Sequence, residues 1–227
     1  MASYAIGDIH GCLTALQLVV KQLPLTQEDT LILLGDYVDR GPNTKGVIDW
    51  ILNYEGPAKL VTLRGNHEVM MLSARDNAEK FFTWQHFGGE EALLSYGFED
   101  NSRWQDCVPD SHWAFLENTL PYHANDKQIF VHASVKPKLA LEDQESRTLY
   151  WKKVSKPRAY SRDHLIICGH TTQYDGEIAN FGHTILIDTY AYGDQWLTGI
   201  NADTLEYWQA NEQQEVRTGN LQSYASD

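Results

Sequence analysis

Two short segments near the start of the chain carry residues whose types and spacing suit metal-assisted chemistry on phosphate. In the first, Asp8 and His10 lie two positions apart between glycines, so a carboxylate and an imidazole can reach one ion. In the second, Asp36 can bridge two ions, and Asp39 and Arg40 follow closely. The guanidinium of Arg40 can bind phosphate oxygens in bidentate fashion. Together the two segments indicate a site for divalent metals and a phosphate ester.

A third segment supplies a candidate ligand and a candidate acid. The amide oxygen of Asn66 can bind a metal, and the adjacent imidazole of His67 can donate a proton. We expect a metal-bound hydroxide to attack phosphorus while His67, oriented by the carboxylate of Asp39, protonates the departing oxygen. The flanking Arg64 and Glu68 are interpreted as structural, Glu68 as a carboxylate at a helix start.

Two further histidines, His132 and His170, stand just after apolar runs. They complete a set of Asp, Asn and His ligands without a thiolate, which favours Mn²⁺, or Fe and Zn, over a closed structural zinc site. Any one of these residues has an ordinary explanation, such as a turn or a buried imidazole, but the combination does not. The predicted ligands of two divalent ions are Asp8, His10, Asp36, Asn66, His132 and His170.

The elements that must position these residues are short apolar runs. Six such runs predict strands, at residues 4–7, 30–35, 59–63, 128–131, 165–168 and 184–187. Between the first strands, apolar residues recur at helical spacing, and Asn43 is a good cap for a second helix. The β-α-β-α-β order predicts a mostly parallel sheet, and ligands collect where the strands of such sheets end.

The rest of the chain is expected to complete one domain over residues 1–209. Residues from about 70 to 122 look helical and carry several tryptophans, so we expect an excursion that walls the site. A hairpin is predicted, with strands at 197–200 and 205–208. The polar segment 210–227 is expected to be a poorly ordered tail.

The composition restricts the class of function. With 227 residues, 42% hydrophobic and 22% charged, the chain reads as an ordinary globular protein. No apolar run approaches the ~20 residues of a membrane helix, and no signal region precedes Tyr4, so we expect a cytoplasmic protein without a membrane partner. The formal charge of -13 argues against nucleic-acid binding. Three widely spaced cysteines, without a C-x-x-C pair, indicate neither disulfides nor a zinc knuckle.

In this order, the segments GDIHG, GDYVDRG, RGNHE, VHA and GHT resemble those of the phosphoprotein phosphatase family of calcineurin-like metallophosphoesterases. The chain looks most similar to the compact bacterial and bacteriophage Ser/Thr protein phosphatases, over about residues 4–198. The resemblance implies an α/β sandwich of two β-sheets flanked by helices, with a dimetal site at the carboxyl ends of the strands. It also implies two Mn²⁺ ions as a common active form.

The resemblance also implies a role for each site residue. Asp8 and His10 would hold one metal, and Asp36 would bridge to the second. The ligands of the second metal would be Asn66, His132 and His170. Arg40 would bind the substrate phosphate, as would Asn66, and His67 would be the general acid beside Asp39.

The chain departs from the family pattern around the expected substrate rim. Lys152 follows Tyr150 and Trp151 where compact bacterial members have a second phosphate-binding arginine, so Lys152 is a candidate substrate-binding residue. Tyr190 follows the Asp-Thr of the last strand where glycine is usual, and Ser134 replaces a glycine after VHA. These changes can reshape the rim without affecting the metal ligands.

Three functions remain in competition. The first is dephosphorylation of phosphoserine or phosphothreonine in proteins. Tyr37 in GDYVDRG and Glu68 in RGNHE favour this function, because both look more like the protein phosphatases. The alternative is hydrolysis of a dinucleoside polyphosphate such as diadenosine tetraphosphate, since related enzymes that cut phosphoanhydrides carry the same metal motifs. The third is a non-catalytic phosphate-binding protein, which is disfavoured because no ligand is missing. The expected partner is a phosphorylated protein or a small phosphate ester, with no obligate protein partner evident.

Overall fold

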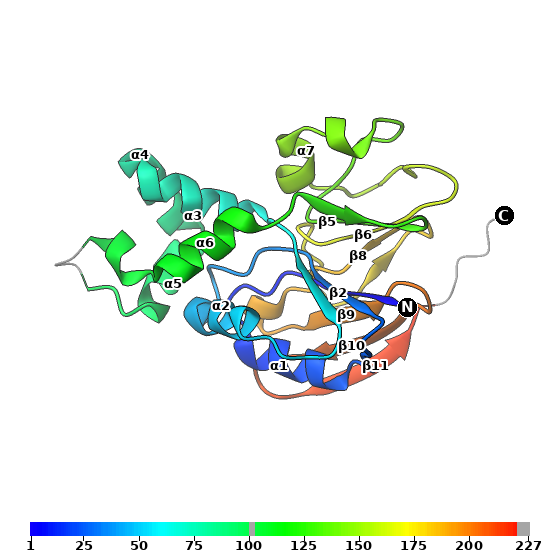
Figure 1. Cartoon of the computed structure of the whole chain (residues 1–227), viewed down its shortest axis with the longest axis horizontal. Helices are drawn as coiled ribbons and strands as arrows, with labels where there is room; N and C mark the ends of the chain where they lie inside the picture. The colour runs from blue at the N-terminus through cyan, green and yellow to red at the C-terminus, as the bar shows by residue number, and fades with distance from the viewer. Residues whose placement is uncertain (100–102, 222–227) are drawn as a thin grey trace.

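In the computed structural model, which describes residues 1–99 and 103–221, the chain folds into two β-sheets flanked by helices (Figure 1). The strands of the first sheet are β1 (Ser3–Ile6), β2 (Thr30–Leu33), β3 (Lys59–Thr62), β9 (Leu197–Asn201), β10 (Glu206–Ala210) and β11 (Val216–Asn220). Those of the second sheet are β4 (Tyr122–Ala124), β5 (Gln128–Val131), β6 (Leu165–Cys168), β7 (Ala179–Asn180) and β8 (Thr184–Leu186). The predicted two-sheet α/β architecture is therefore confirmed.

Each sheet is built around parallel strands. The first has the order β11-β10-β9-β1-β2-β3, in which β1, β2 and β3 are parallel to one another. The second has the order β4-β5-β6-β8-β7, in which β5, β6 and β8 are parallel. All six strands predicted from apolar runs are confirmed, as is the predicted hairpin, formed by β9 and β10, whereas β4, β7 and β11 were not predicted. Because parallel strands end at the same edge of a sheet, the loops that follow them emerge together.

Alternate residues of the central strands point to opposite faces of the first sheet. Ile6 of β1 and Leu33 of β2 belong to the core on the outer face. Ala5 and Ile32 belong instead to the core between the sheets, together with Phe130 of β5. All five side chains are fully buried. Both faces of these strands are covered, which explains why their sequences are apolar throughout.

Helices cover the outer faces of both sheets. On the first sheet lie α1 (Leu13–Gln22) and α2 (Thr44–Leu52) (Figure 1). The predicted cap of α2 is confirmed, since the side chain of Asn43 accepts a hydrogen bond from the N–H of Gly46 at 2.8 Å. On the second sheet lies α7 (Ser146–Trp151), whose Leu149 packs in one cluster with residues of β5 and β6.

The predicted excursion is a helical lobe, which we define as residues 66–99 and 103–118. Its elements are α3 (Asn66–Asp76), α4 (Ala78–Trp84), the π-helical turn η1 (Gln85–Gly89), α5 (Glu90–Ser95), the 3-10 turn η2 (Trp104–Cys107) and α6 (Asp110–Asn118). The rings of Trp84 and Trp104 lie 4.9 Å apart, and Trp113 packs against Trp104 at 5.6 Å. These rings belong to the same buried cluster as the core on the outer face of the first sheet, so the lobe extends that core as it projects from one end of the sandwich (Figure 1).

The prediction of a poorly ordered tail from residue 210 is wrong for the part of it that the structure describes. Strand β11 pairs antiparallel with β10, and Glu212 between them accepts a hydrogen bond from the N–H of Ala15 at 2.9 Å. As the edge strand of its sheet, β11 has one neighbour and buries little, so its polar sequence looks like a loop. Residues 222–227 lie outside the described residues.

Among the described residues, the helices are all too short or too polar to cross a membrane.

Candidate metal centre

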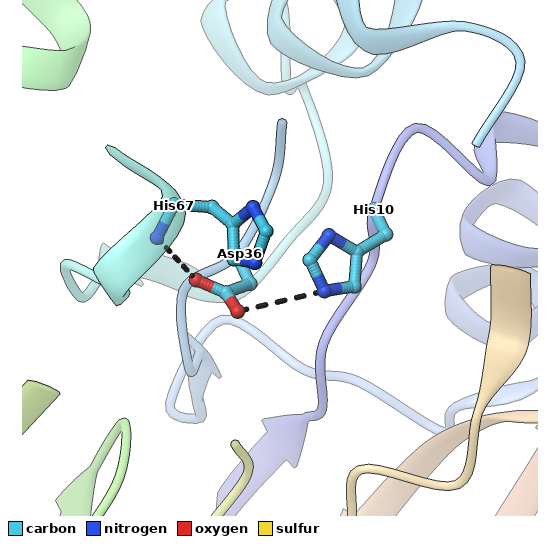
Figure 2. A group of neighbouring side chains, drawn as sticks. All are labelled: His10, Asp36 and His67. Carbon is cyan, nitrogen blue, oxygen red and sulfur yellow. Dashed lines mark hydrogen bonds and ion pairs between the residues drawn. The ribbon is translucent and has the colours of Figure 1, made fainter. Parts of the chain in front are cut away.

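The six predicted ligands converge at the carboxyl ends of the parallel strands. They lie within four residues of the ends of β1, β2, β3, β5 and β6, and are Asp8, His10, Asp36, Asn66, His132 and His170. Ligand atoms of His10, Asp36 and His67 lie within 4.8 Å of one another, and so do those of Asp36, His132 and His170. Figure 2 shows the carboxylate of Asp36 between His67 and His10. Asp36 is common to both groups, which is the geometry required of a bridging carboxylate.

The histidines of the site present lone pairs rather than N–H groups to its centre. Nδ1 of His10 donates to the carbonyl of Val38 at 2.8 Å, and Nδ1 of His132 donates to the carbonyl of Leu34 at 3.1 Å. The Nε2 atom of each ring is therefore an acceptor, and each lies 3.5 Å from a carboxylate oxygen of Asp36. Nε2 of His170 is buried without a hydrogen-bond partner among the described residues. Such backbone-oriented imidazoles are typical of metal ligands.

Three buried carboxylates face one another at the same place. Asp8, Asp36 and Asp188 are each no more than 3% exposed. Burial, then the charges of Asp188 and Asp36, raises the pKa of Asp8 well above its ordinary value. Burial likewise raises the pKa of Asp188 to about 6. Bound divalent cations would offset this repulsion, so the residues present fit two metal ions.

Asp188 was not among the predicted site residues. It directly follows the predicted strand at residues 184–187, which was the signal that could have identified it. Its carboxylate accepts hydrogen bonds from the hydroxyl of Thr172 at 2.7 Å and from the N–H of Tyr190 at 3.3 Å. These contacts fix its orientation toward Asp8 and the other ligands.

The backbone of the site adopts conformations that are costly for side-chain-bearing residues. Positive φ angles occur at His10, Asp36 and His170, at 44°, 51° and 58°. Gly169 is required by close approach, because a Cβ at this position would lie 1.9 Å from Oδ1 of Asp8. Such strain is maintained only where the surrounding contacts determine the conformation, and it concentrates at functional sites.

One buried carboxylate outside the ligand set, that of Glu68, supports the loop that carries Asp36. Oε2 accepts the N–H groups of Asp36 and Gly65, both at 2.8 Å. Oε1 accepts the N–H groups of Tyr37 at 2.8 Å and Val38 at 3.3 Å. The prediction of a structural carboxylate at a helix start is confirmed, but its contacts also join α3 to the loop after β2.

The predicted acid and its partner are in contact. Nδ1 of His67 lies 2.6 Å from Oδ2 of Asp39, and both side chains are buried. The indole N–H of Trp84 donates to the same carboxylate at 2.9 and 3.0 Å. Burial lowers the pKa of His67 to about 4, so the imidazole is neutral near pH 7 and takes up its proton only where a bound phosphate anion stabilises the protonated form. This arrangement suits a proton donor that is oriented by Asp39.

The other predicted phosphate ligand, Arg40, lies beside the metal groups. Its Nη1 donates to Nε2 of His10 at 3.0 Å, and its guanidinium carbon lies 4.7 Å from the ring centre of Tyr192. The backbone N–H of Arg40 donates to the carbonyl of Gly88 in the helical lobe at 2.9 Å. The lobe therefore positions this arginine as well as walling the site.

A cavity of about 280 Å³ opens over these residues. Asp8, Asp36, Arg40, Asn66, His67 and His170 form its polar wall. The lysine at this cavity is Lys153, whereas the predicted Lys152 lines two neighbouring cavities and not this one. Adjacent residues after α7 point in different directions, and the sequence could not show which of the two lysines faces the metals.

Arg64 is structural, as predicted. Its guanidinium donates to the hydroxyl of Thr119 at 2.9 Å and to the carbonyls of Leu116 and Glu117 at 3.1 and 2.6 Å. These contacts join the loop after β3 to the end of α6.

The chain is similar to curated bacterial enzymes named symmetrical bis(5'-nucleosyl)-tetraphosphatase. The enzyme of Dechloromonas aromatica is 40% identical over 138 residues, which cover 60% of this chain and 45% of that protein. The enzyme of Pseudomonas fluorescens is 28% identical over 142 residues, which cover 62% of this chain and 44% of that protein. The chain thus spans less than half the length of these relatives. In fold it resembles a cold-active protein-tyrosine phosphatase of Shewanella, with a TM-score of 0.67 and 14% identity over 95% and 79% of the two chains.

The prediction that the chain is a Ser/Thr protein phosphatase is wrong, because its curated relatives carry the name of the alternative. The structure shows why the argument for it failed. Tyr37 and Glu68, on which it relied, face the protein interior: the hydroxyl of Tyr37 donates to the carbonyl of Leu63 at 2.7 Å, and Glu68 binds backbone N–H groups. Neither side chain reaches the cavity, so neither can distinguish one substrate from another.

The model of the family described as calcineurin-like phosphoesterase matches residues 1–199. That range includes every predicted metal ligand together with Arg40, His67 and Asp188. The chain therefore belongs to the calcineurin-like phosphoesterase family of metal-dependent hydrolases.

Proposed function

We propose that this chain hydrolyses dinucleoside tetraphosphates with two divalent metal ions, Mn²⁺ being the first candidate. The observation that carries the proposal is the similarity to the symmetrical bis(5'-nucleosyl)-tetraphosphatases. The buried Asp36, shared by two ligand groups, supports the use of paired ions. Carboxylate, amide and imidazole ligands without a thiolate support Mn²⁺.

We divide the ligands between the two ions as the family resemblance implies. Asp8 and His10 would hold one ion, and Asp36 would contact both. Asn66, His132 and His170 would hold the second ion. When bound, the ions stabilise charge on the phosphoryl group and activate the attacking water.

The protein's own groups then bind the substrate and move a proton. Arg40 grips oxygens of the phosphoryl group under attack. The oxygen of water, whose proton passes to solvent, bonds to phosphorus as the bond to the oxygen between the second and third phosphates breaks. His67, held by Asp39, gives its proton to that departing oxygen. The products are two nucleoside diphosphates, which is what symmetrical cleavage means.

The test is an assay of the purified protein with Mn²⁺ and diadenosine tetraphosphate, with the products separated by ion-exchange chromatography. The expected product is ADP alone, without AMP or ATP. The matched control is Asp36→Asn, which removes the shared carboxylate and should lose both bound metal and turnover. An absence of nucleotide turnover by the metal-loaded wild type would overturn the proposal, and AMP with ATP as products would overturn the symmetrical cleavage.

A further inference from the structure

Aromatic side chains surround the metal cavity at two separate places. The first group, which we call the tryptophan pocket, consists of Met70, Phe87 and Trp151. These three residues line both the metal cavity and an adjoining, mainly apolar cavity of about 320 Å³. Phe87 is 48% exposed and Trp151 is 42% exposed. Large exposed apolar side chains beside a polar site indicate a surface that binds a ligand.

The second group, which we call the tyrosine platform, consists of Tyr174, Tyr190 and Tyr192. The ring of Tyr190 lies 5.0 Å from that of Tyr174 and 4.8 Å from that of Tyr192. Tyr192 in turn lies 4.9 Å from the ring of the metal ligand His10. Tyr174, at the outer end, is 65% exposed. The platform therefore extends from the metal groups to the protein surface and shares no residue with the tryptophan pocket.

The backbone at the platform is strained at its central residue. Tyr190 has a φ of 64°, a left-handed conformation that glycine adopts most easily and that is costly for a tyrosine. Its ring lies against Gly193, where a Cβ would approach the ring to 2.1 Å. The Asp188 carboxylate accepts the N–H of Tyr190, which connects the platform to the metal centre.

We propose that the two aromatic groups bind the two nucleosides of a dinucleoside polyphosphate, one base stacking in the tryptophan pocket and the other on the tyrosine platform. This inference rests on the proposed function. A substrate of this class has a base at each end of an anionic chain, so two aromatic surfaces with positive charge between them match its chemistry. Base stacking on aromatic side chains is worth about 1–3 kcal/mol per base and tolerates different bases, since every base has a π-face.

Arg40 and Lys153 supply positive charge at the metal cavity, where a polyphosphate chain would lie. Arg40 contacts the Tyr192 ring at 4.7 Å and lines the metal cavity, so it lies between the tyrosine platform and the metal ligands. Lys153 lines the same cavity two residues after Trp151. In a chain with a formal charge of -13, these two cations and the bound metals provide the attraction for a tetraphosphate.

The experiment compares Trp151→Ala and Tyr174→Ala with wild type on diadenosine tetraphosphate and on p-nitrophenyl phosphate, which lacks nucleosides. From the stacking energy we expect each variant to raise KM for the nucleotide by about 5- to 150-fold. The ratio of kcat/KM between the two substrates should fall by a similar factor. Trp151→Phe and Tyr174→Phe keep a stacking surface and should recover most of the loss. Phe181→Ala removes a partly exposed ring away from the metal cavity, and it should leave KM and kcat/KM unchanged for both substrates.

A binding measurement separates stacking from catalysis. Calorimetric titration with ADP should show weaker binding to each alanine variant, whereas inorganic pyrophosphate, which lacks a base, should be affected much less. If wild type hydrolyses the nucleotide but the alanine variants behave like Phe181→Ala, this inference is overturned and the proposed function stands. If wild type fails to hydrolyse the nucleotide, the proposed function is overturned and the inference with it. Far-UV circular dichroism checks that each variant is folded. If one alanine variant is unfolded, the other is compared with wild type on the two substrates.

Discussion

Replacing His67 by asparagine tests the chemical step without removing a predicted metal ligand. Nδ1 of His67 lies 2.6 Å from Asp39, and the N–H of Trp84 holds that carboxylate in place. The side-chain NH₂ of asparagine can donate to the same carboxylate, so we expect the loop and its ligand Asp36 to keep their positions. The imidazole proton that would reach the departing oxygen is lost.

The magnitude depends on the leaving group. A positioned proton donor contributes about 10²- to 10⁴-fold, or about 2.7–5.4 kcal/mol at about 1.36 kcal/mol per tenfold. A departing nucleoside diphosphate is a far weaker base than an alkoxide and depends less on protonation. We therefore expect His67→Asn to lower kcat by about 10²-fold on diadenosine tetraphosphate and by closer to about 10⁴-fold on a simple alkyl phosphate.

The assay measures kcat for both substrates together with bound metal by mass spectrometry. His183→Asn is the matched control, since His183 lies outside the metal cavity. An equal loss on both substrates would refute proton donation by His67, because a general acid must matter more for the poorer leaving group. Loss of metal together with activity would instead assign His67 to the ligand group with which it clusters, beside His10 and Asp36.

Three further substitutions test the supports of the site and of the fold. Glu68→Ala leaves four buried N–H groups without their acceptor, so urea unfolding should show a loss of at least about 3 kcal/mol, whereas the exposed Glu55→Ala should cost less than about 0.5 kcal/mol. Gly169→Ala drives a Cβ against Asp8, so bound metal should fall, and full metal occupancy would contradict the steric argument. Burial raises the pKa of Asp29, but hydrogen bonds from Ala2 and Thr26 outweigh it and the net pKa is lowered. Its carboxylate therefore stabilises the fold above the unfolded pKa of about 3.9, and this stability is lost as pH falls through the folded pKa. Asp29→Asn should be less stable than wild type at pH 7, with a difference that shrinks below about pH 4; a constant difference would contradict this.

The metal ligands could be predicted because their signals are local. Each ligand stands within a few residues of a short apolar run, and such runs, when bounded by turn residues, are consistent with buried strands. The ends of parallel strands in one sheet meet at one edge, so the positions of Asp8 after β1 and Asp36 after β2, and of His132 after β5 and His170 after β6, implied that each pair approaches. That the two pairs meet depends on how the two sheets pack, which the strand ends alone do not show.

The features that sequence reasoning missed depend on contacts between distant segments. Glu68 was predicted to be structural, but nothing near it in the chain signals its contacts with the N–H groups of Asp36 and Tyr37, more than thirty positions earlier. Strand β11 lies at the edge of its sheet and has a polar sequence, so its sequence alone does not identify it as a strand. It becomes a strand by pairing with β10. In both cases the local pattern permits several structures and the tertiary contact selects one.

The error about the substrate has the same origin. Metal motifs report the chemistry of the reacting phosphorus, which protein phosphatases and nucleotide hydrolases have in common, whereas selectivity depends on side chains that touch the rest of the substrate. Here those side chains come from separate segments: Phe87 from the helical lobe, Trp151 from the end of α7 and Tyr174 from the loop after β6. In the sequence each looks like an ordinary packing aromatic, and only its exposure beside the metal cavity separates it from Trp84, which is fully buried in the lobe. In this proposal, the exposed aromatic rings around the metal cavity select the class of substrate. The variants Trp151→Ala and Tyr174→Ala measure that selection directly through the ratio of kcat/KM between the two substrates.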